Sequence, residues 1–187
     1  MKKIYMLGGK ARSGKDTIAS YIKAYYETAN VKCAILQISS SLKYYASKVL
    51  NWDGLEESKP REFLQHIGTE VIRKQMGKDF LINRIIEDIE ILFNYIDVVI
   101  VSDVRLPDEF ISVKESFDNV TNILVKRNNY KSNLLNNENK HLTEVALEMF
   151  EKYDVLIEND EGLDELKQKI IKVLKEEVKW KKWVQTN

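Results

Sequence analysis

The chain has 187 residues, of which 44% are hydrophobic and 31% charged, as is ordinary for a soluble globular protein of one domain, with or without small insertions. Lys and Arg number 29, as do Asp and Glu, and this zero net charge argues against a general nucleic-acid-binding protein. Cys33 is the only cysteine, which excludes an intrachain disulfide and suits a reducing compartment.

Short apolar runs recur along the chain and are expected to form strands. The first contains only five apolar residues in a row, too few for a signal peptide, and no later run is long enough to span a membrane. We therefore expect a cytoplasmic protein, in the host cytoplasm if it is viral. The five runs are residues 3–8, 32–39, 97–103, 121–126 and 153–159.

Helical patterns alternate with these runs, at residues 14–28, 62–76, 80–93 and 163–178. In the second pattern Phe63, Ile67 and Val71 recur every four residues. The last pattern places on one face Leu163, Leu166, Ile170, Val173 or Leu174, and Val178. Strands that alternate with helices predict an α/β fold with a five-stranded parallel sheet covered on both sides. Ligands bind such sheets at the edge where the strands end.

Two segments interrupt the alternation. Residues 40–80 hold more helix than one crossover needs, and residues 127–143 are polar, rich in asparagine and without periodicity. Segments of this kind in an α/β core are often lids or substrate-binding flaps. We expect a single domain over 1–187 with these two insertions.

The first strand leads into Gly9, Gly14 and Lys15, which fit the pattern G-x-x-x-x-G-K. Glycines let the backbone wrap closely, so that successive N–H groups face phosphate oxygens, and the following helix adds its positive end. Lys15 is expected to hold the β- and γ-phosphates of a nucleotide. The alternative is a glycine-rich turn without a ligand. The expected phosphate contacts are Gly9, Ser13, Gly14, Lys15, Asp16 and Thr17.

Asp16 stands where most such loops have serine or threonine, and Thr17 follows it. The carboxylate either holds Mg²⁺ through water or favours the helix start, and the Thr17 hydroxyl is a second candidate for the metal. Asp103 ends the most apolar strand and is a third candidate, also through water. Arg105 is close enough to Asp103 in sequence to reach a phosphate, or else is a solvated arginine.

The motifs "SGKDT", "REFLQHIGTEVIRKQMGKDF", "VSDVRLPDE", "HLTE" and "IENDEGLDELK" resemble the bacteriophage-type deoxynucleoside monophosphate kinases, in order and across nearly the whole chain. The aspartate after the loop lysine is shared by that group and by animal-type phosphomevalonate kinases. The resemblance implies a P-loop NTPase core, a three-layer sandwich. It also implies that residues 40–80 grip the acceptor monophosphate and that residues 127–143 form a lid over ATP.

The spacing of Arg61, Gln65, Thr69 and Arg73 places them on one helix face. The resemblance implies that this face meets the acceptor, with Arg61 and Arg73 on its phosphate and Gln65 on its base. Asp103 and Arg105 complete the expected acceptor site. The alternative for the helix is a solvated face. The neighbouring His66 is expected to be structural, because in-line transfer needs no histidine nucleophile.

On the ATP side, the resemblance places Arg127 at the lid hinge, against the adenine or the phosphates, with Lys126 and Lys131 as weaker alternatives. It also implies a loop around the adenine, although a plain turn before a helix would read the same way. That loop contains Asn159, Asp160 and Gly162. Thr143 or Glu144 is a weaker candidate to hold a lid arginine.

The lid has few arginines beyond Arg127, which leaves the transition-state charge to Lys15, Arg12, Arg105 and Arg127. Arg12 lies inside the loop, and the sequence leaves open whether it faces ATP or the acceptor nucleotide. The C-terminal "KWKKWVQTN" matches nothing in the family pattern, and packing on the core is favoured over a surface contact.

These features predict a kinase that uses ATP and Mg²⁺ to phosphorylate a deoxynucleoside monophosphate. The alternatives are a kinase of another small phosphate, such as phosphomevalonate or a ribonucleotide, and a P-loop ATPase or nucleotide-binding module without a small acceptor. The expected partners are small-molecule nucleotides, with no membrane and no direct nucleic-acid contact. The sequence leaves open the accepted bases, the choice between ribose and deoxyribose, and a monomer or a homodimer.

Overall fold

The computed structural model describes residues 2–128 and 146–186, with only the backbone described at 178–186. Its centre is a sheet of five parallel strands in the order β2-β3-β1-β4-β5. The strands are β1 (Lys3–Gly8), β2 (Cys33–Leu36), β3 (Val98–Val104), β4 (Val120–Lys126) and β5 (Val155–Glu158). The predicted five-stranded parallel sheet is confirmed.

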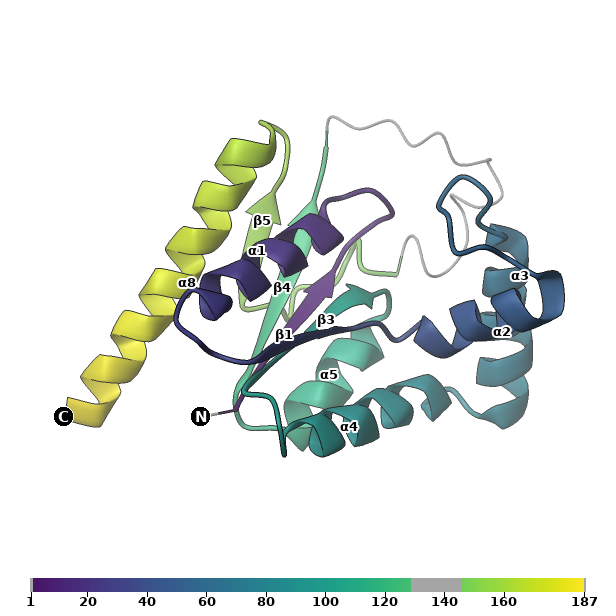
Figure 1. Cartoon of the computed structure of the whole chain (residues 1–187), viewed down its shortest axis with the longest axis horizontal. Coiled ribbons are helices and arrows are strands. Elements are labelled where there is room, and N and C mark those ends of the chain that lie inside the picture. The colour runs from purple at the N-terminus through teal and green to yellow at the C-terminus, as the bar shows by residue number, and fades with distance from the viewer. Residues whose placement is uncertain (1, 129–145, 187) are drawn as a thin grey trace.

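Helices cover both faces of this sheet and make three layers (Figure 1). α1 (Lys15–Glu27) and α8 (Leu163–Thr186) cover one face, and α4 (Phe80–Leu92) and α5 (Pro107–Ser116) cover the other. The sequence patterns did not predict α5, because it is short and buries few apolar side chains, chiefly Phe110 and Val113.

The alternation of side chains along β1 explains why the sheet needs helices on both faces. Tyr5 and Leu7 pack under α1 and α8, whereas Ile4 and Met6 pack toward α4 and α5. All four side chains are at most 1% exposed. Successive strand residues point to opposite faces, so a strand that is apolar throughout has to be covered twice.

The apolar face of α8 differs from the prediction at its beginning. Leu166, Ile170 and Leu174 recur every four residues and are buried against the sheet. Leu163, which was expected on the same face, is 64% exposed because it opens the first turn at the end of the sheet. The side chain of Val178 and those of the C-terminal Trp/Lys segment lie outside the described residues, so their packing stays a prediction.

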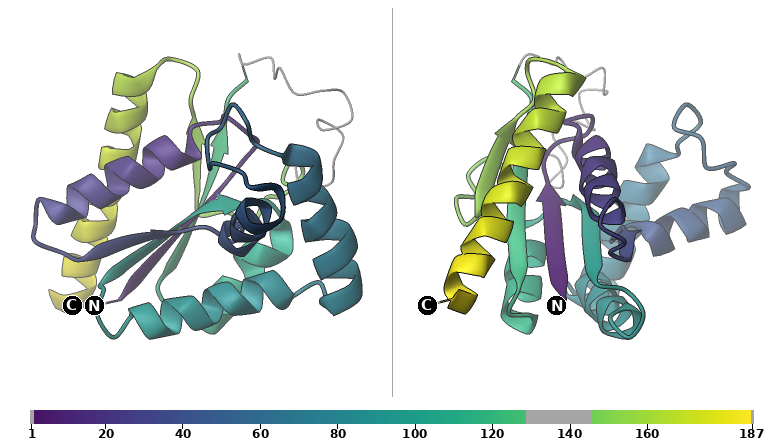
Figure 2. Two further views of the ribbon diagram at one scale, coloured as in Figure 1. Left: turned by 45° about the vertical axis from the view of Figure 1, so that its right-hand side comes forward. Right: turned by 60° about the vertical axis from the view of Figure 1, so that its left-hand side comes forward.

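The second predicted strand, 32–39, is a strand only at Cys33–Leu36. The chain then turns, and α2 (Ser40–Leu50) begins the first insertion. The insertion continues with α3 (Arg61–His66) and the π-helix η1 (Ile67–Met76). In Figures 1 and 2, α2 and α3 project from the side of the sheet that lies away from α8.

The helical stretch α3–η1 packs on the core through the row Leu64, Gly68 and Ile72. The adjacent row on the helix is Arg61, Gln65, Thr69 and Arg73. Gly68 and Ile72 are buried and Leu64 packs beside them, whereas Phe63, Ile67 and Val71 are half-buried. The wider turn ends where Gly77 N–H donates to Ile72 O at 3.1 Å, an i→i+5 bond.

The registers of the strands bring the loops that follow them to one edge of the sheet. Gly8, the last residue of β1, pairs with Val104 on one side and Leu124 on the other. Lys126 pairs with Glu158 on β5. The segments that begin at residues 9, 105, 127 and 159 therefore start side by side, where α/β proteins bind ligands.

Most of the predicted lid, 127–143, lies outside the described residues, and so do Lys131, Thr143 and Glu144. Within the parts of the chain that the structure describes, no helix is long and apolar enough to cross a membrane.

Candidate functional site

The loop between β1 and α1 wraps around the amine of Lys15. Its Nζ donates to Gly9 O at 2.8 Å and to Lys10 O at 2.6 Å, and its side chain is buried. Gly9 and Gly14 have φ of 145° and 104°, in the region that favours glycine. A Cβ on Gly9 would lie 2.3 Å from Val125 O, so this position also needs glycine for space. The loop thus has the tight wrap expected of a phosphate-binding loop.

Asp16 lies in the first turn of α1, where its charge favours the positive end of the helix. Its Oδ1 also accepts a hydrogen bond from Ser102 Oγ at 2.9 Å, which ties the loop to β3. Asp16 is exposed and Thr17 half-buried, so both still offer oxygen atoms at the mouth of the loop. Their role toward a metal stays a prediction.

Two cavities meet at this loop. A cavity of about 280 Å³ lies toward the ends of β4 and β5, and one of about 420 Å³ lies toward the insertion. Arg12, Lys15 and Asp16 line both cavities. The loop lysine therefore stands between two spaces, as a phosphoryl group that passes from a donor to an acceptor requires.

The smaller cavity contains most of the residues expected around ATP. Gly14, Thr17, Arg127, Asn159 and Gly162 line it, and Asp160 does not. Asp160 accepts hydrogen bonds from Asn128 N at 2.7 Å and Asn128 Nδ2 at 2.9 Å. Asp160 thus holds the start of the segment after β4, and its predicted contact with adenine stays a prediction.

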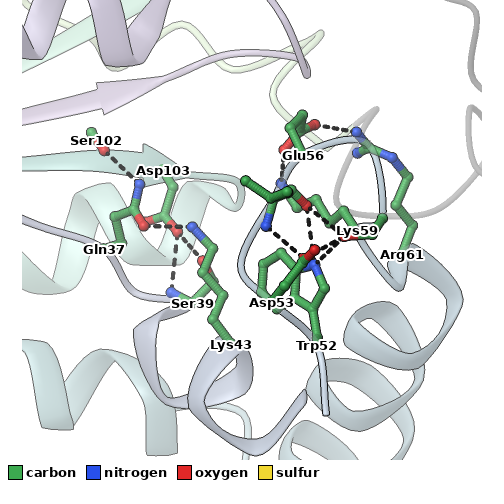
Figure 3. Close-up of polar contacts among 12 residues, drawn as sticks. Gln37, Ser39, Lys43, Trp52, Asp53, Glu56, Lys59, Arg61, Ser102 and Asp103 are labelled. Carbon is green, nitrogen blue, oxygen red and sulfur yellow. Dashed lines mark hydrogen bonds and ion pairs between the residues drawn. The ribbon is translucent and has the colours of Figure 1, made fainter. Parts of the chain in front are cut away.

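The larger cavity brings together the four residues spaced along α3 and η1: Arg61, Gln65, Thr69 and Arg73. Arg61 forms an ion pair with Glu56 from the preceding loop, which Lys59 also joins. Partial burial opposes ionisation of Glu56, but these two cations outweigh it and hold the pKa of the carboxyl below its usual range. The insertion thus presents a network of charges at the cavity (Figure 3).

Asp103 reaches the same cavity from β3, but its carboxylate is engaged with the start of the insertion. Oδ1 accepts the N–H of Ile38 at 2.7 Å, and Oδ2 accepts Ser39 N at 3.1 Å and Ser39 Oγ at 2.5 Å. Asp103 therefore anchors α2 to the core, in addition to its predicted role toward the metal or acceptor (Figure 3).

Sequence reasoning missed several cavity residues. Lys43 lies one turn into α2, donates to Gln37 Oε1 at 2.5 Å, and has its pKa lowered by burial, which the nearby Asp103 opposes. The sequence signal that could have identified Lys43 is its position shortly after the second strand. The other missed polar residues of this cavity are Gln37, Ser39, Glu56, Lys59, Ser102 and Glu109.

Glu109 is the buried acidic residue among the missed ones. Its Oε1 accepts a hydrogen bond from Arg73 Nη2 at 2.6 Å, and its Oε2 accepts the N–H groups of Arg105 at 2.7 Å and Leu106 at 3.0 Å. Burial raises the pKa of the Glu109 carboxyl, while Arg73 and the two N–H groups oppose this shift. A single side chain therefore contacts both the insertion and the turn after β3.

The charge of the larger cavity suits an anion, because Lys and Arg outnumber Asp and Glu on its walls. The basic residues are Arg12, Lys15, Lys43, Lys59, Arg61, Arg73 and Arg105, and the acidic ones are Asp16, Glu56, Asp103 and Glu109. Among the described residues, no group of three or more His, Cys, Asp or Glu could hold a metal ion alone. Mg²⁺ usually keeps several waters and binds one or two carboxylates together with substrate phosphates, and Asp16 and Asp103 are carboxylates that line this cavity.

A model of the deoxynucleotide monophosphate kinase family matches residues 39–170, well over half of the chain. The chain belongs to this family. The match begins at Ser39 and includes the insertion, Asp103, Glu109 and Arg127. The phosphate-binding loop precedes the matched range, so the loop and the family match are separate observations that agree.

Solved structures share the fold of this deoxynucleotide monophosphate kinase family member. A sugar kinase from Janibacter sp. aligns with a TM-score of 0.56 at 12% identity, over 94% of this chain and 95% of that chain. The APS kinase of Mycobacterium tuberculosis, in complex with AMPPNP and APS, gives 0.55 at 13%, over 93% and 98%. Shikimate kinase from Aquifex aeolicus gives 0.52 at 15%, over 94% and 98%.

At such low sequence identity, the structural similarity shows the fold alone, which is that of P-loop kinases. A comparison with curated proteins found no match.

Proposed function

We propose that this protein transfers the γ-phosphoryl group of ATP to a deoxynucleoside monophosphate and forms the diphosphate. The observation that carries the proposal is the meeting of two cavities at Lys15, of which the larger has a surplus of basic side chains. The family match supports the same conclusion for the acceptor. The larger cavity, of about 420 Å³, is within the range of sites for small ligands.

On the donor side, the loop from Gly9 to Lys15 is proposed to hold the ATP phosphates through its backbone N–H groups and the Lys15 amine. Lys15 now donates to two loop carbonyls, so its amine is already held within the loop. When ATP binds, the amine is proposed to exchange one of these carbonyls for a phosphate oxygen. Arg127 lines the same cavity and is proposed to contact the adenine or the phosphates.

On the acceptor side, Arg61, Arg73 and Arg105 are proposed to bind the monophosphate of the acceptor, and Gln65 its base. A glutamine amide offers a donor and an acceptor, which suits the edge of a base. With the acceptor phosphate oriented by these arginines, one of its oxygens attacks the γ-phosphorus in line, and ADP leaves. Arg12 lines both cavities and is proposed to stabilise the charge that develops between them.

Asp16, Thr17 and Asp103 are the oxygen ligands that fit Mg²⁺, largely through water. When bound, the ion neutralises charge on the β- and γ-phosphates. The Ser102 hydroxyl, which donates to Asp16 at 2.9 Å, would keep that carboxylate oriented toward the end of β3, where Asp103 also lies.

The test measures ADP formed from ATP and Mg²⁺ with each of the deoxynucleoside monophosphates, the ribonucleoside monophosphates, phosphomevalonate and no acceptor. The proposal expects turnover that depends on a deoxynucleoside monophosphate and is lost in Lys15→Ala. Lys10→Ala is the matched control, because Lys10 lies in the same loop but lines neither cavity, and its amine pairs with Glu148. ADP formed without any acceptor, or no ADP with any monophosphate, would overturn the proposal.

The role of Gln65 is tested separately by Gln65→Leu, which keeps the size of the side chain and removes its amide. The variant is expected to lose selectivity among bases more than it loses turnover with the preferred base. If all acceptors fall by the same factor, Gln65 does not contact the base.

A further inference from the structure

One buried carboxylate joins the insertion to the core beside the larger cavity. Glu109 lies in the first turn of α5, and its side chain is only 3% exposed. It contacts Arg73 at 2.6 Å, which lies 36 residues away on η1, and the backbone N–H groups of Arg105 and Leu106. Each of its oxygens therefore contacts a different part of the fold: Oε1 contacts the insertion, and Oε2 contacts the turn after β3.

Both arginines that Glu109 contacts line the cavity; Arg73 lies on η1 and Arg105 in the turn between β3 and α5. A second nitrogen of the Arg73 guanidinium, Nη1, donates to Lys78 O at 3.3 Å, so two contacts hold this flat group in one orientation. An arginine held before its ligand arrives loses less side-chain entropy when the ligand binds. Such pre-organisation is the usual contribution of residues that support a binding site from behind.

We propose that Glu109 is a positioning residue for the acceptor, which holds the Arg73 guanidinium and the Arg105 backbone at the cavity so that the acceptor phosphate meets two cations in place. This inference rests on the proposed function, because it takes the acceptor to be a monophosphate. Glu109 itself does not touch the acceptor in this mechanism; it acts through the two arginines.

Two other roles for Glu109 predict different results. A carboxylate that merely neutralises Arg73 would compete with the phosphate, so its removal would tighten acceptor binding. A carboxylate that only caps α5 and stabilises the fold would leave acceptor binding unchanged when it is altered. The positioning role alone predicts weaker acceptor binding after its charge is removed. The sign of the change therefore separates the three.

The variant Glu109→Gln separates the two oxygens. Its remaining carbonyl oxygen still accepts the N–H groups of Arg105 and Leu106, while its amide nitrogen faces Arg73 with a donor against a donor. The acceptor KM is expected to rise about tenfold to a hundredfold, since a buried partner left unmatched costs that much. The KM for ATP is expected to stay within about twofold, because Glu109 does not line the smaller cavity. An acceptor KM that falls or stays unchanged overturns the proposal.

A double variant tests whether Glu109 acts through Arg73. In an Arg73→Gln background, the further change Glu109→Gln is expected to alter the acceptor KM by less than about twofold, because the contact is already gone. Equal effects of Glu109→Gln with and without Arg73 would overturn the proposed route.

The matched control is Glu177→Gln, the same exchange in a carboxylate at the opposite end of the sheet. Glu177 accepts hydrogen bonds from Lys3 at 3.1 Å, Thr121 at 2.5 Å and Tyr5 at 2.5 Å. This control is expected to lower the melting temperature and leave both KM values unchanged. A rise in its acceptor KM like that of Glu109→Gln would show that loss of stability alone produces the effect, and would overturn the proposal.

If Glu109→Gln does not fold, the variant Arg73→Lys tests the same contact by changing the partner of Glu109. A lysine keeps the charge but has one compact head group, so it serves either Glu109 or the phosphate. The acceptor KM is expected to rise about tenfold; an unchanged value would show that charge suffices without positioning. A wild type that phosphorylates no monophosphate would remove the proposed function as well, whereas an active wild type with unaffected variants removes only the role of Glu109.

Discussion

The side-chain amide of Asn159 is hydrogen-bonded to the phosphate-binding loop: Asn159 Nδ2 donates to Ser13 O at 2.9 Å, and both residues are buried. The backbone N–H of Asn159 donates to Lys126 O at 2.8 Å, so the same residue is attached to β4. A loop at the end of the sheet thereby braces the loop at its centre, which sequence reasoning had not foreseen for this asparagine.

We expect Asn159→Asp to weaken ATP binding and to lower the free energy of unfolding by about 1–3 kcal/mol, because a carboxylate oxygen would face the Ser13 carbonyl without a donor. Urea unfolding and the KM for ATP measure the two effects. Asn119→Asp is the matched control, since Asn119 Nδ2 also donates to a backbone carbonyl, at 2.6 Å, but on an exposed surface. Equal losses in the two variants would contradict a specific role for Asn159.

Gly9 and Gly54 offer a test of how much the phosphate-binding loop depends on close packing. Both have positive φ, 145° and 87°, but a Cβ on Gly9 would meet Val125 O at 2.3 Å, whereas nothing lies within 4 Å of one on Gly54. Gly54→Ala is expected to cost about 1–2 kcal/mol from backbone strain alone. Gly9→Ala is expected to cost clearly more and to abolish turnover, since a backbone carbonyl cannot move aside. Chemical unfolding compares them, and similar costs would refute the packing argument.

The contact between Asp103 and Ser39 predicts that the two residues are energetically coupled. Asp103→Asn and Ser39→Ala are each expected to destabilise the protein, and the double variant by less than their sum, with a coupling of about 0.5–3 kcal/mol. Urea unfolding of the four proteins gives this value. Additive losses would mean that the carboxylate does not hold α2.

The same four proteins separate anchoring from a role at the metal. If Asp103 also serves Mg²⁺ through water, Asp103→Asn should shift the Mg²⁺ concentration for half-maximal activity and Ser39→Ala should not. Equal shifts in both variants would assign the effect to the displaced insertion.

Burial raises the pKa of the Cys33 thiol to about 11, with the nearby Glu27 as a further cause. The folded pKa thus lies above the unfolded value of about 8.5, so the stability this thiol contributes is present below pH 8.5 and lost as the pH rises through about 11. Because the thiolate is the nucleophile, alkylation of native Cys33 by iodoacetamide should still be rising between pH 9 and 10, whereas in urea it should level off. A native rate that levels off near pH 9 would contradict the shift.

Several parts of the fold were predictable because their signals are local. Residues 3–17 contain a short apolar run, the glycine-lysine pattern and a helix start in one continuous stretch, and each has its own physical cause. The apolar run at the start of β3, residues 98–101, likewise predicted a strand covered on both faces. The row Arg61, Gln65, Thr69 and Arg73 reached one cavity because a helix repeats about every four residues.

Other features were not predictable, since they depend on partners far away in the chain. The Leu163 side chain fits the apolar pattern of α8, yet the sheet ends before it and leaves it exposed. The hydrogen bonds from Asn128 to Asp160 join two residues 32 positions apart, and no local pattern predicted them.

By itself the sequence determined the class of the protein: a parallel α/β sheet with a phosphate-binding loop at the end of its first strand, because strand, turn and helix signals lie within a few residues of one another. Only the tertiary structure decided what the carboxylates of that edge do. Asp103 and Glu109 find their partners 64 and 36 residues away, at Ser39 and Arg73. The packing of the insertion against the sheet decides which donor each carboxylate meets. No local sequence pattern predicts a contact between residues so far apart in the chain.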